Sequence, residues 1–333
     1  MNKKITKTKY SNLIQDISGL LEDSRKKVYY QVNNILVQTY WYIGKHIVEF
    51  DQGKDERAQY GAGLLKKISK DLTKQYGKGF NERSLRNYRQ FYKIFPKWST
   101  VSTKLTWSHY KLIMKKEEKL ARMFYIKETE NENWSVRELD RQINSLLFER
   151  LALSKNKKQV LELAQKGQII EKPKDLIRDP YVLEFLGLKE DTSYTESELE
   201  QRIIENLKQF ILELGKGFMF VDRQKRINMD DERFYIDLVF YNRILRCFVL
   251  IELKIGKLTH GDLGQLQMYV NYYDRDIKEE NENPTIGILL CAEKSKAVVK
   301  YTLPEDNKQI SAAEYKLYLP DKKILEKEIK KLL

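Results

Sequence analysis

The sequence predicts an α/β C-terminal domain with a mixed sheet, preceded by an all-α or mainly α N-terminal domain. Three observations lead to this expectation. The chain has 333 residues, which is long for one average domain. Apolar side chains recur three or four positions apart over residues 10–50, as in an amphipathic helix. After Glu196, helical stretches alternate with apolar strands, which is typical of an α/β layer with mixed strand directions.

The two halves of the chain differ in charge. Residues 1–170 contain 34 Lys and Arg against 18 Asp and Glu, whereas residues 171–333 contain 27 against 30. Such segregation is expected when one domain holds a polyanion and the other does something else. We therefore place the boundary at Glu171 and expect residues 1–170 to bind DNA and residues 171–333 to carry the catalytic chemistry.

Composition excludes several classes of protein. No run of eighteen apolar residues and no signal-peptide core occur, so we expect a cytoplasmic protein without a membrane span. Cys247 and Cys291 lie in apolar runs and are expected to be buried small hydrophobes. Phosphate-binding and dinucleotide-binding glycine motifs are absent.

The basic half begins with a predicted helix over Tyr10–Phe50, in which a break near Ser24 is allowed and which ends at Asp51-Gln-Gly53. A helix over Leu64–Tyr76, a glycine turn and a helix over Glu82–Phe95 follow. This order is the outline of a helix-turn-helix.

The second helix of this outline has a polar face suited to a major groove. Arg, Asn and Gln side chains match base edges and phosphates, and the face carries Arg83, Arg86, Asn87, Arg89 and Gln90. An ordinary solvated helix face is the alternative.

The remainder of the basic half is predicted to be mostly helical. Residues 98–110 are expected to form a wing or an irregular link. Lys155–Lys158 and Glu171–Lys174 are expected to flank a polar, lightly structured bridge. Helices are expected over Thr106–Lys116, Glu117–Thr129 and Ser135–Leu153.

The other half is predicted as a helix, three strands, a helix and a strand, followed by a helix, a strand near Tyr315–Leu319 and a charged C-terminal helix. The first six elements span Glu196–Leu214, Phe218–Ile227, Phe234–Tyr241, Arg246–Lys254, Gly261–Asp274 and Thr285–Cys291.

Three charged residues interrupt two of these apolar strands. Glu252 and Lys254 point to the same side of one strand, and hairpin pairing can bring Asp237 beside them. Burying two carboxylates is costly unless a cation compensates, and a divalent metal together with a lysine would do so. The alternative is an exposed strand with a local ion pair, which the apolar neighbours of Glu252 disfavour.

Two helical residues could join this group. Glu200 points with the apolar face of its helix, where it could favour the helix N-terminus or reach the metal site. Gln265 lies four residues before Tyr269 on one helix face, and both could lean over the carboxylates.

The spacing from Asp237 to Glu252-Leu253-Lys254, within this order of elements, resembles the PD-(D/E)XK nuclease superfamily, whose domain has a restriction-endonuclease-like fold. Within it, the segments LGKGFMFVDRQ, YIDLVFYNRILRCFVLIELK and GQLQMYV resemble the YhcG-like family. The segments GLLKKISKDLTKQYGKGFNERSLRNYRQFY and NWSVRELDRQI resemble that family's winged helix-turn-helix-like N-terminal part. Ile236 precedes Asp237 where proline is common, a position that varies in the superfamily.

The resemblance implies a Mg²⁺- or Mn²⁺-dependent endodeoxyribonuclease acting in recombination, repair or defence against foreign DNA. Asp237, Glu252 and the carbonyl of Leu253 would bind the metal, and Lys254 would orient or deprotonate the attacking water. Glu200 would bind metal through water or a second ion, and Gln265 would support Lys254 or the phosphate.

Two other readings stay open at the level of sequence. One is a DNA-binding regulator whose nuclease-like domain only docks a partner, and the other is an RNA-directed enzyme. Cutting both strands with one site per chain would favour a homodimer.

Overall fold

The computed structural model describes residues 7–52, 60–153, 155–189 and 194–332. The chain divides into two compact units, residues 1–139 and 140–333. The division falls within one helix, α6 (Val136–Asn144). Among the described residues, no helix is both long enough and apolar enough to cross a membrane.

The first unit is helical, as predicted. Its elements are α1 (Lys7–Gln52), α2 (Tyr60–Tyr76), η1 (Lys78–Phe80), α3 (Glu82–Ile94), η2 (Trp98–Thr100), α4 (Trp107–Ile113) and α5 (Lys119–Glu132).

The C-terminal part of α1 crosses α3 closely. A Cβ atom at Gly44 would lie 2.0 Å from the carbonyl oxygen of Tyr88, so only glycine allows this approach. Beside it the rings of Tyr40 and Tyr88 stack with centroids 4.4 Å apart. The indole of Trp41 donates a hydrogen bond to the carbonyl of Phe95 at 2.7 Å, which joins α1 to the residue that follows α3.

The helix, turn and helix expected after residue 60 are present. Gly77 takes the positive φ of 86° that its turn requires, and Asn81 caps α3 by accepting from the backbone N–H of Ser84. The allowed break near Ser24 does not occur, because α1 is continuous.

Residues 98–110, all of them described, form an irregular link and not a wing: the turn η2 and an irregular stretch lead into α4. One expectation for this half is wrong. The bridge expected between Lys155–Lys158 and Glu171–Lys174 contains most of the helix α8 (Lys157–Lys166), which Asn156 and Gln159 begin with a capping box. A polar composition concealed that helix, although its buried stripe of Val160, Leu163 and Ala164 follows helical spacing.

The second unit has the predicted mixed sheet, with strand order β1-β6-β5-β4-β3-β2. Strands β2, β3 and β4 pair antiparallel, and β4, β5, β6 and β1 pair parallel. The strands are β1 (Tyr181–Val182), β2 (Phe218–Met229), β3 (Glu232–Asn242), β4 (Cys247–Lys257), β5 (Ile286–Glu293) and β6 (Ile310–Lys316). The remaining elements of this unit are α7 (Leu147–Ala152), η3 (Pro173–Asp175), η4 (Glu184–Leu186), α9 (Glu196–Glu205), α10 (Leu207–Leu214), α11 (His260–Tyr272), the π-helix η5 (Tyr273–Ile277), α12 (Lys296–Thr302) and α13 (Lys322–Leu332).

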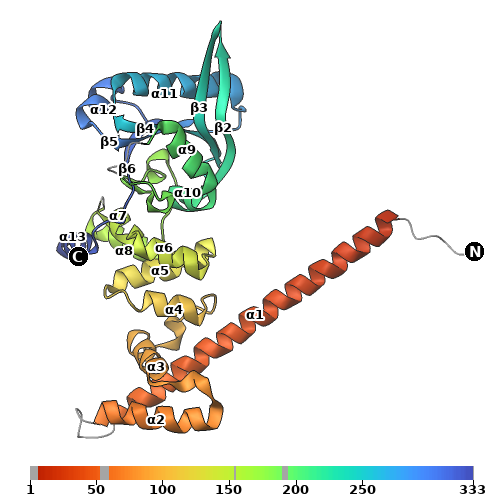
Figure 1. Cartoon of the computed structure of the whole chain (residues 1–333), viewed down its shortest axis with the longest axis vertical. Coiled ribbons are helices and arrows are strands. Elements are labelled where there is room, and N and C mark those ends of the chain that lie inside the picture. The colour runs from red at the N-terminus through yellow and green to blue at the C-terminus, as the bar shows by residue number, and fades with distance from the viewer. Residues whose placement is uncertain (1–6, 53–59, 154, 190–193, 333) are drawn as a thin grey trace, which may run out of the picture. The chain divides into compact units, whose positions relative to one another are not determined.

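Helices cover both faces of this sheet (Figure 1). Residues of α9 and α10, among them Leu199 and Phe210, pack in one apolar core, and residues of α11, among them Leu266, pack in the other. Gly287 of β5 lies so close under α11 that a Cβ atom there would come within 2.9 Å of Leu266. The carboxylate-bearing strands β3 and β4 are therefore held between two cores.

Three elements differ from their predicted form. The expected helix over Glu196–Leu214 is two helices, because the backbone of Asn206 leaves the helical conformation with a φ of −115° and a ψ of 30°. The side-chain amide of Asn206 donates to the carbonyl of Arg202 at 3.0 Å at this helix end. The helix expected over Ser135–Leu153 breaks after α6, where Leu146 has a φ of 55°. The last strand runs over Ile310–Lys316, and Tyr318 and Leu319 lie outside it with exposed side chains.

A buried carboxylate joins the start of the second unit to its sheet. Glu213 is fully buried and lies 2.7 Å from Arg150, 3.1 Å from Arg141 and 3.6 Å from Arg178. Its Oε1 also accepts the backbone N–H of Val182 at 3.0 Å. Burial alone would raise the pKa of Glu213, but the three guanidinium groups outweigh it and hold the pKa at about 2.

We expect Glu213→Gln to destabilise the protein by about 3–5 kcal/mol, because it leaves buried guanidinium charge without its partner. The lowered pKa gives the ion cluster its stabilising effect above pH ~4.5, and this effect is lost as pH falls toward 2. The difference in free energy of unfolding between wild type and variant should therefore shrink in acid. Urea unfolding at pH 7, 5 and 3 measures it, with Glu205→Gln at an exposed position as the control.

Candidate active site

Asp237 and Glu252 lie where strands β3 and β4 separate. Regular pairing ends at Leu238 and Ile251, and the next residues along the two strands are the two acids. There the backbone N–H of Asp237 donates to Glu252 Oε1 at 3.1 Å, and the N–H of Leu253 donates to Asp237 Oδ2 at 2.8 Å. Carboxylate oxygens thus take the place of carbonyl oxygens, which holds both acid groups against the opposite strand.

The two carboxyl groups share a poorly solvated position. Burial, followed by the charge of Asp237, raises the pKa of Glu252 to about 9. Burial likewise raises the pKa of Asp237, against the hydrogen bonds from Leu253 and Gln224 that lower it. Without a cation, Glu252 is therefore protonated at neutral pH.

Glu200 of α9 joins this pair through a glutamine. The side-chain amide of Gln224 donates to Glu200 Oε2 at 2.6 Å and to Asp237 Oδ1 at 2.8 Å. Glu200 is 6% exposed, so its side chain faces the sheet as its place on the apolar helix face predicts. The structure thus brings Glu200, Asp237 and Glu252 into one acidic group.

Gln224 is the site residue that the sequence did not predict. It lies on β2 with a φ of 44°, in the left-handed region that is costly for a side chain of this kind. A register shift between Phe220 and Asp222 precedes it in the pairing with β3. This backbone geometry turns the side-chain amide of Gln224 toward the carboxylates, and no spacing pattern in the sequence predicts that conformation.

Lys254 follows on β4, two residues beyond Glu252. Its ammonium group lies 3.2 Å from Glu196 Oε1 and 3.6 Å from Asp262 Oδ1. Desolvation alone would lower the pKa of Lys254, but Glu196 and Asp262 raise it above its usual value. Lys254 is thus a stable cation at the edge of the acidic group.

Gln265 lies near this group, and Arg223 is ion-paired with its member Glu200. The amide of Gln265 donates to the hydroxyl of Tyr269 at 2.5 Å. Burial, then the charges of Glu252 and Asp237, raise the pKa of Tyr269. Arg223 lies 3.6 Å from Glu200 Oε1 and donates to Gln201 at 3.1 Å.

The donors at this site suit a hard divalent cation. Oε1 of Glu200 is buried and accepts no hydrogen bond. Asp237 and Glu252 add carboxylate oxygens, and the nearby Lys254 pairs with Glu196 and Asp262 instead of with them. Within the described ranges no three or more His, Cys, Asp and Glu side chains form a ready-made metal cluster, so a cation would have to draw these oxygens together.

The predicted DNA-contacting residues lie along α3. Arg83, Arg86 and Gln90 are exposed, whereas Asn87 and Arg89 are half-buried. Arg86 lies 3.2 Å from Glu82, and Arg89 lies 3.5 Å from Asp51 of α1. The amide of Gln90 approaches the carbonyl of Met114 at 3.5 Å.

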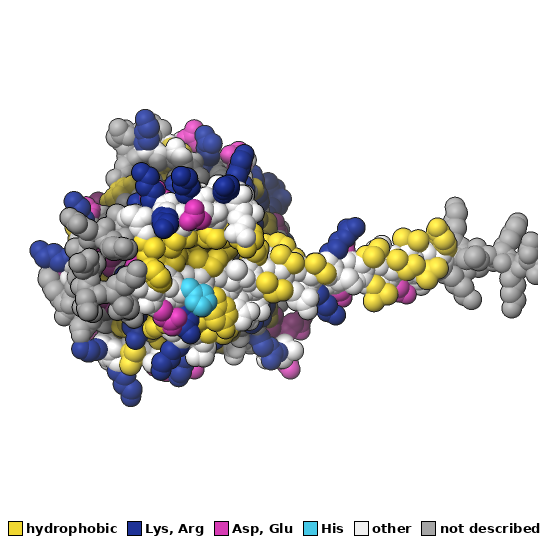
Figure 2. Space-filling model, turned by 90° about the horizontal axis from the view of Figure 1, so that it is seen from below, with side chains coloured by type: hydrophobic (Ala, Val, Ile, Leu, Met, Phe, Trp, Pro, Cys, Tyr) yellow, Lys and Arg dark blue, Asp and Glu magenta, His cyan; other side chains and the backbone are white. Residues whose placement is uncertain are grey.

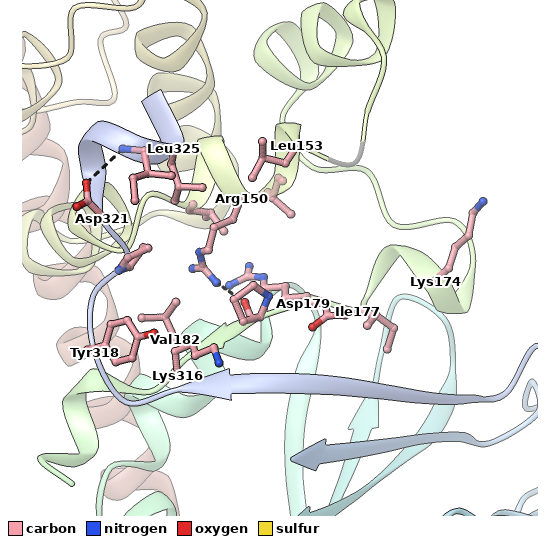
Figure 3. Close-up of a pocket in the computed structure, with 16 residues that line it drawn as sticks. Arg150, Leu153, Lys174, Ile177, Asp179, Val182, Lys316, Tyr318, Asp321 and Leu325 are labelled. Carbon is pink, nitrogen blue, oxygen red and sulfur yellow. Dashed lines mark hydrogen bonds between the residues drawn. The ribbon is translucent and has the colours of Figure 1, made fainter. Parts of the chain in front are cut away.

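A pocket of about 740 Å³ lies elsewhere in the second unit, at the ends of α7, β6 and α13 (Figure 3). Its charged floor includes Arg150 and Arg178, and both already contact Glu213. Its other walls include the apolar side chains of Ile177, Val182 and Leu325. It lacks the hydrogen-bonded carboxyl pair of the β3–β4 edge.

Comparison with known families matches most of the chain. Residues 174–331 match the family model described as YhcG PDDEXK nuclease domain, and residues 16–150 match the DUF1016 N-terminal domain. A curated relative, "Putative nuclease YhcG" of Escherichia coli (strain K12), is 39% identical over 352 aligned positions, which cover 96% of this chain and 93% of the relative.

Solved structures resemble only part of this chain, and their overall similarity to it is low. A repair endonuclease from Pyrococcus abyssi has 21% sequence identity and a TM-score of 0.25, covering 40% of this chain and 50% of that one. A complex of EndoMS with double-stranded DNA has 16% identity and a TM-score of 0.27, covering 40% and 51%.

We expect Glu252→Gln to raise the thermal stability of the protein in EDTA, and to do so increasingly between pH 5 and pH 9. The pKa of Glu252 rises from about 4.5 to about 9 on folding, so the wild type loses stability as pH rises through this range. The slope cannot exceed about 1.4 kcal/mol per pH unit. Differential scanning calorimetry measures the effect, and Glu232→Gln, at an exposed position of β3, is the control. A pH-independent difference between wild type and Glu252→Gln would contradict the desolvated carboxylate pair.

Proposed function

Because the chain belongs to the YhcG family of PD-(D/E)XK nucleases, we propose that it is a metal-dependent endodeoxyribonuclease acting at the β3–β4 edge. The observation that carries the proposal is the half-buried pair of Asp237 and Glu252, to which no lysine or arginine of the described residues is ion-paired. A structural ion pair would have placed a lysine or arginine against them, as happens at Glu213.

Asp237, Glu252 and Glu200 would hold Mg²⁺ or Mn²⁺, together with the main-chain carbonyl of Leu253. When bound, the metal would polarise the scissile phosphate and lower the pKa of a coordinated water. Gln224 would keep Glu200 and Asp237 oriented toward each other, since its amide already bridges them.

Lys254 would stabilise the negative charge that develops on the phosphate. A raised pKa supports a role as a cation that orients the water and offsets charge, in preference to a role as a general base. Glu196 and Asp262 hold the ammonium group of Lys254 beside the acidic group. A bound phosphate could attract the ammonium group away from these two partners. Gln265 stays a supporting residue in this proposal, acting on Lys254 or on the phosphate.

We further propose that α3 contacts DNA. The excess of positive charge in residues 1–170 and the exposed Arg83 and Arg86 support this role. Asn87, Arg89 and Gln90 would contribute at the margins of the same face, because two of them are half-buried and Gln90 approaches a carbonyl of its own unit.

A DNA-binding regulator with a non-cleaving nuclease-like domain is the second candidate. The observation that favours it is the pairing of Lys254 with Glu196 and Asp262, which a docking domain would also keep. Cleavage that requires a divalent metal separates the two functions.

Asp237→Asn, Glu252→Gln and Lys254→Ala should each lower the rate of DNA cleavage by ~100-fold or more, because each removes a charge that acts in the transition state. Double variants should be scarcely slower than single ones, since the three groups act as a unit. The measurement is cleavage of linear, circular and branched DNA with Mg²⁺ and with EDTA, with Glu232→Gln as the control. Cleavage by wild type in excess EDTA would refute the metal role, and absence of cleavage on every substrate would favour the regulator.

Replacing both Arg83 and Arg86 by Ala should weaken DNA binding and make its dependence on log salt concentration shallower by about 2, since each phosphate contact contributes a slope of about −0.9. If both residues read guanines instead, affinity should fall on preferred sequences by about 1–3 kcal/mol per residue. Binding is measured against KCl concentration in EDTA with an Asp237→Asn background. The control replaces the exposed Lys322 and Lys323 by Ala, which removes the same charge from α13. Equal effects of the two pairs would exclude α3 as the contacting helix.

A further inference from the structure

The hairpin formed by β2 and β3 continues past the rest of the sheet (Figure 1). Strand β3 pairs with β2 over its whole length, whereas its pairing with β4 ends at Leu238. We call the two-stranded part beyond this point, residues 225–236, the β2–β3 arm. Its base lies at the candidate active site, because residue 225 directly follows Gln224 and residue 236 directly precedes Asp237.

One face of the arm packs against the second unit. Opposite residues of an antiparallel pair share a face, and the register sets Ile227 opposite Phe234. Ile227 and Ile236 are buried, Phe234 is half-buried, and all three pack in the apolar core that contains α11. This inner face therefore holds the arm in place along its length.

The outer face of the arm carries hydrogen-bond donors. In the register Arg226 lies opposite Tyr235 and Asn228 lies opposite Arg233, and all four side chains are exposed. The Nε of Arg226 donates to the side-chain oxygen of Asn228 at 2.9 Å, which orients the guanidinium group along this face. Arg, Asn and Tyr are side chains that contact phosphate and sugar oxygens in protein–DNA complexes.

The three acids of the arm lie away from its outer face. Asp230 and Asp231 form the turn at the tip, and Glu232 lies opposite Met229, which alternation places on the inner face. Positive charge thus lies toward the active site and negative charge at the far end. This distribution suits a polyanion that crosses the base of the arm and turns away from its tip.

We propose that the outer face of the β2–β3 arm binds the phosphates of duplex DNA that neighbour the scissile phosphate. The proposal rests on the proposed nuclease function and adds a DNA contact within the catalytic unit. Phosphate contacts fix the register and orientation of a protein on DNA but do not read its bases. The arm residues are therefore positioning residues that act on every sequence alike.

The spacing along the arm suits this role. Residues two apart on a strand are separated by about 6.8 Å, so Tyr235 lies one such step from Asp237 and Arg233 lies two steps, about 14 Å. At a rise of about 3.4 Å per nucleotide, this distance covers about four nucleotides of one DNA strand. The arm thus reaches phosphates close to the one that the carboxyl pair would face.

DNA binding by the full chain in EDTA tests the arm, with Asp237→Asn as the background. Arg226→Ala combined with Arg233→Ala should weaken binding by about 10-fold or more and make its dependence on log salt concentration shallower by about 2, on every sequence. The matched control, Arg243→Ala combined with Arg275→Ala, removes two exposed arginines elsewhere in the same unit. The first unit has exposed basic side chains of its own (Figure 2), so the two double variants are compared with each other. Equal slopes for both would overturn the proposal.

Cleavage kinetics separate failure of the arm from failure of the nuclease. With Mg²⁺ and an intact carboxyl pair, the Arg226 and Arg233 double variant should raise KM by about 10-fold and leave kcat within about 3-fold, because the lost contacts hold the substrate without touching the reacting atoms. An unchanged KM in an enzyme that still cuts DNA would overturn the arm alone. A wild type that neither binds nor cuts DNA would overturn both proposals.

Cross-linking tests where the arm lies on DNA. Both natural cysteines are buried, so the thiol introduced by Asn228→Cys is the one that takes a photo-cross-linker. It should cross-link to DNA within about four nucleotides of the cut, whereas the same label at Arg243→Cys should not. Absence of a cross-link from position 228, or equal cross-linking from both positions, would overturn the proposal.

Discussion

The central constraint on the second unit is the partial burial of two carboxyl groups side by side, with no lysine or arginine of the described residues ion-paired to either. Another acid in the same unit shows what the protein does when it only needs stability. Glu213 is fully buried and is surrounded by Arg141, Arg150 and Arg178, and its pKa falls to about 2. Glu252 is half-buried and faces Asp237 instead, and its pKa rises to about 9. The two environments thus have opposite electrostatic results, and only the pair without a basic partner would be stabilised by a cation from solution.

Four elements of the fold supply the groups that surround the two acids. Strands β3 and β4 stop pairing at Leu238 and Ile251 and leave their backbone N–H groups to the acids. Helix α9 presents Glu200 from its apolar face, and the left-handed Gln224 of β2 ties that acid to Asp237. Backbone strain at Gln224 is therefore stored directly beside the carboxyl groups, and under the proposed function it would preorganise them.

The sequence predicted the acids but not their setting, and the reason is physical. Charges in an apolar strand are conspicuous because burial makes them costly, so Asp237, Glu252 and Lys254 could be found from their neighbours alone. The position of Gln224 depends on a register shift in β2, and the partners of Lys254 depend on where α9 and α11 begin, which are tertiary features. The same limit applies to secondary structure. Periodicity located the predicted helix over Glu196–Leu214, yet the non-helical backbone of Asn206 divides it.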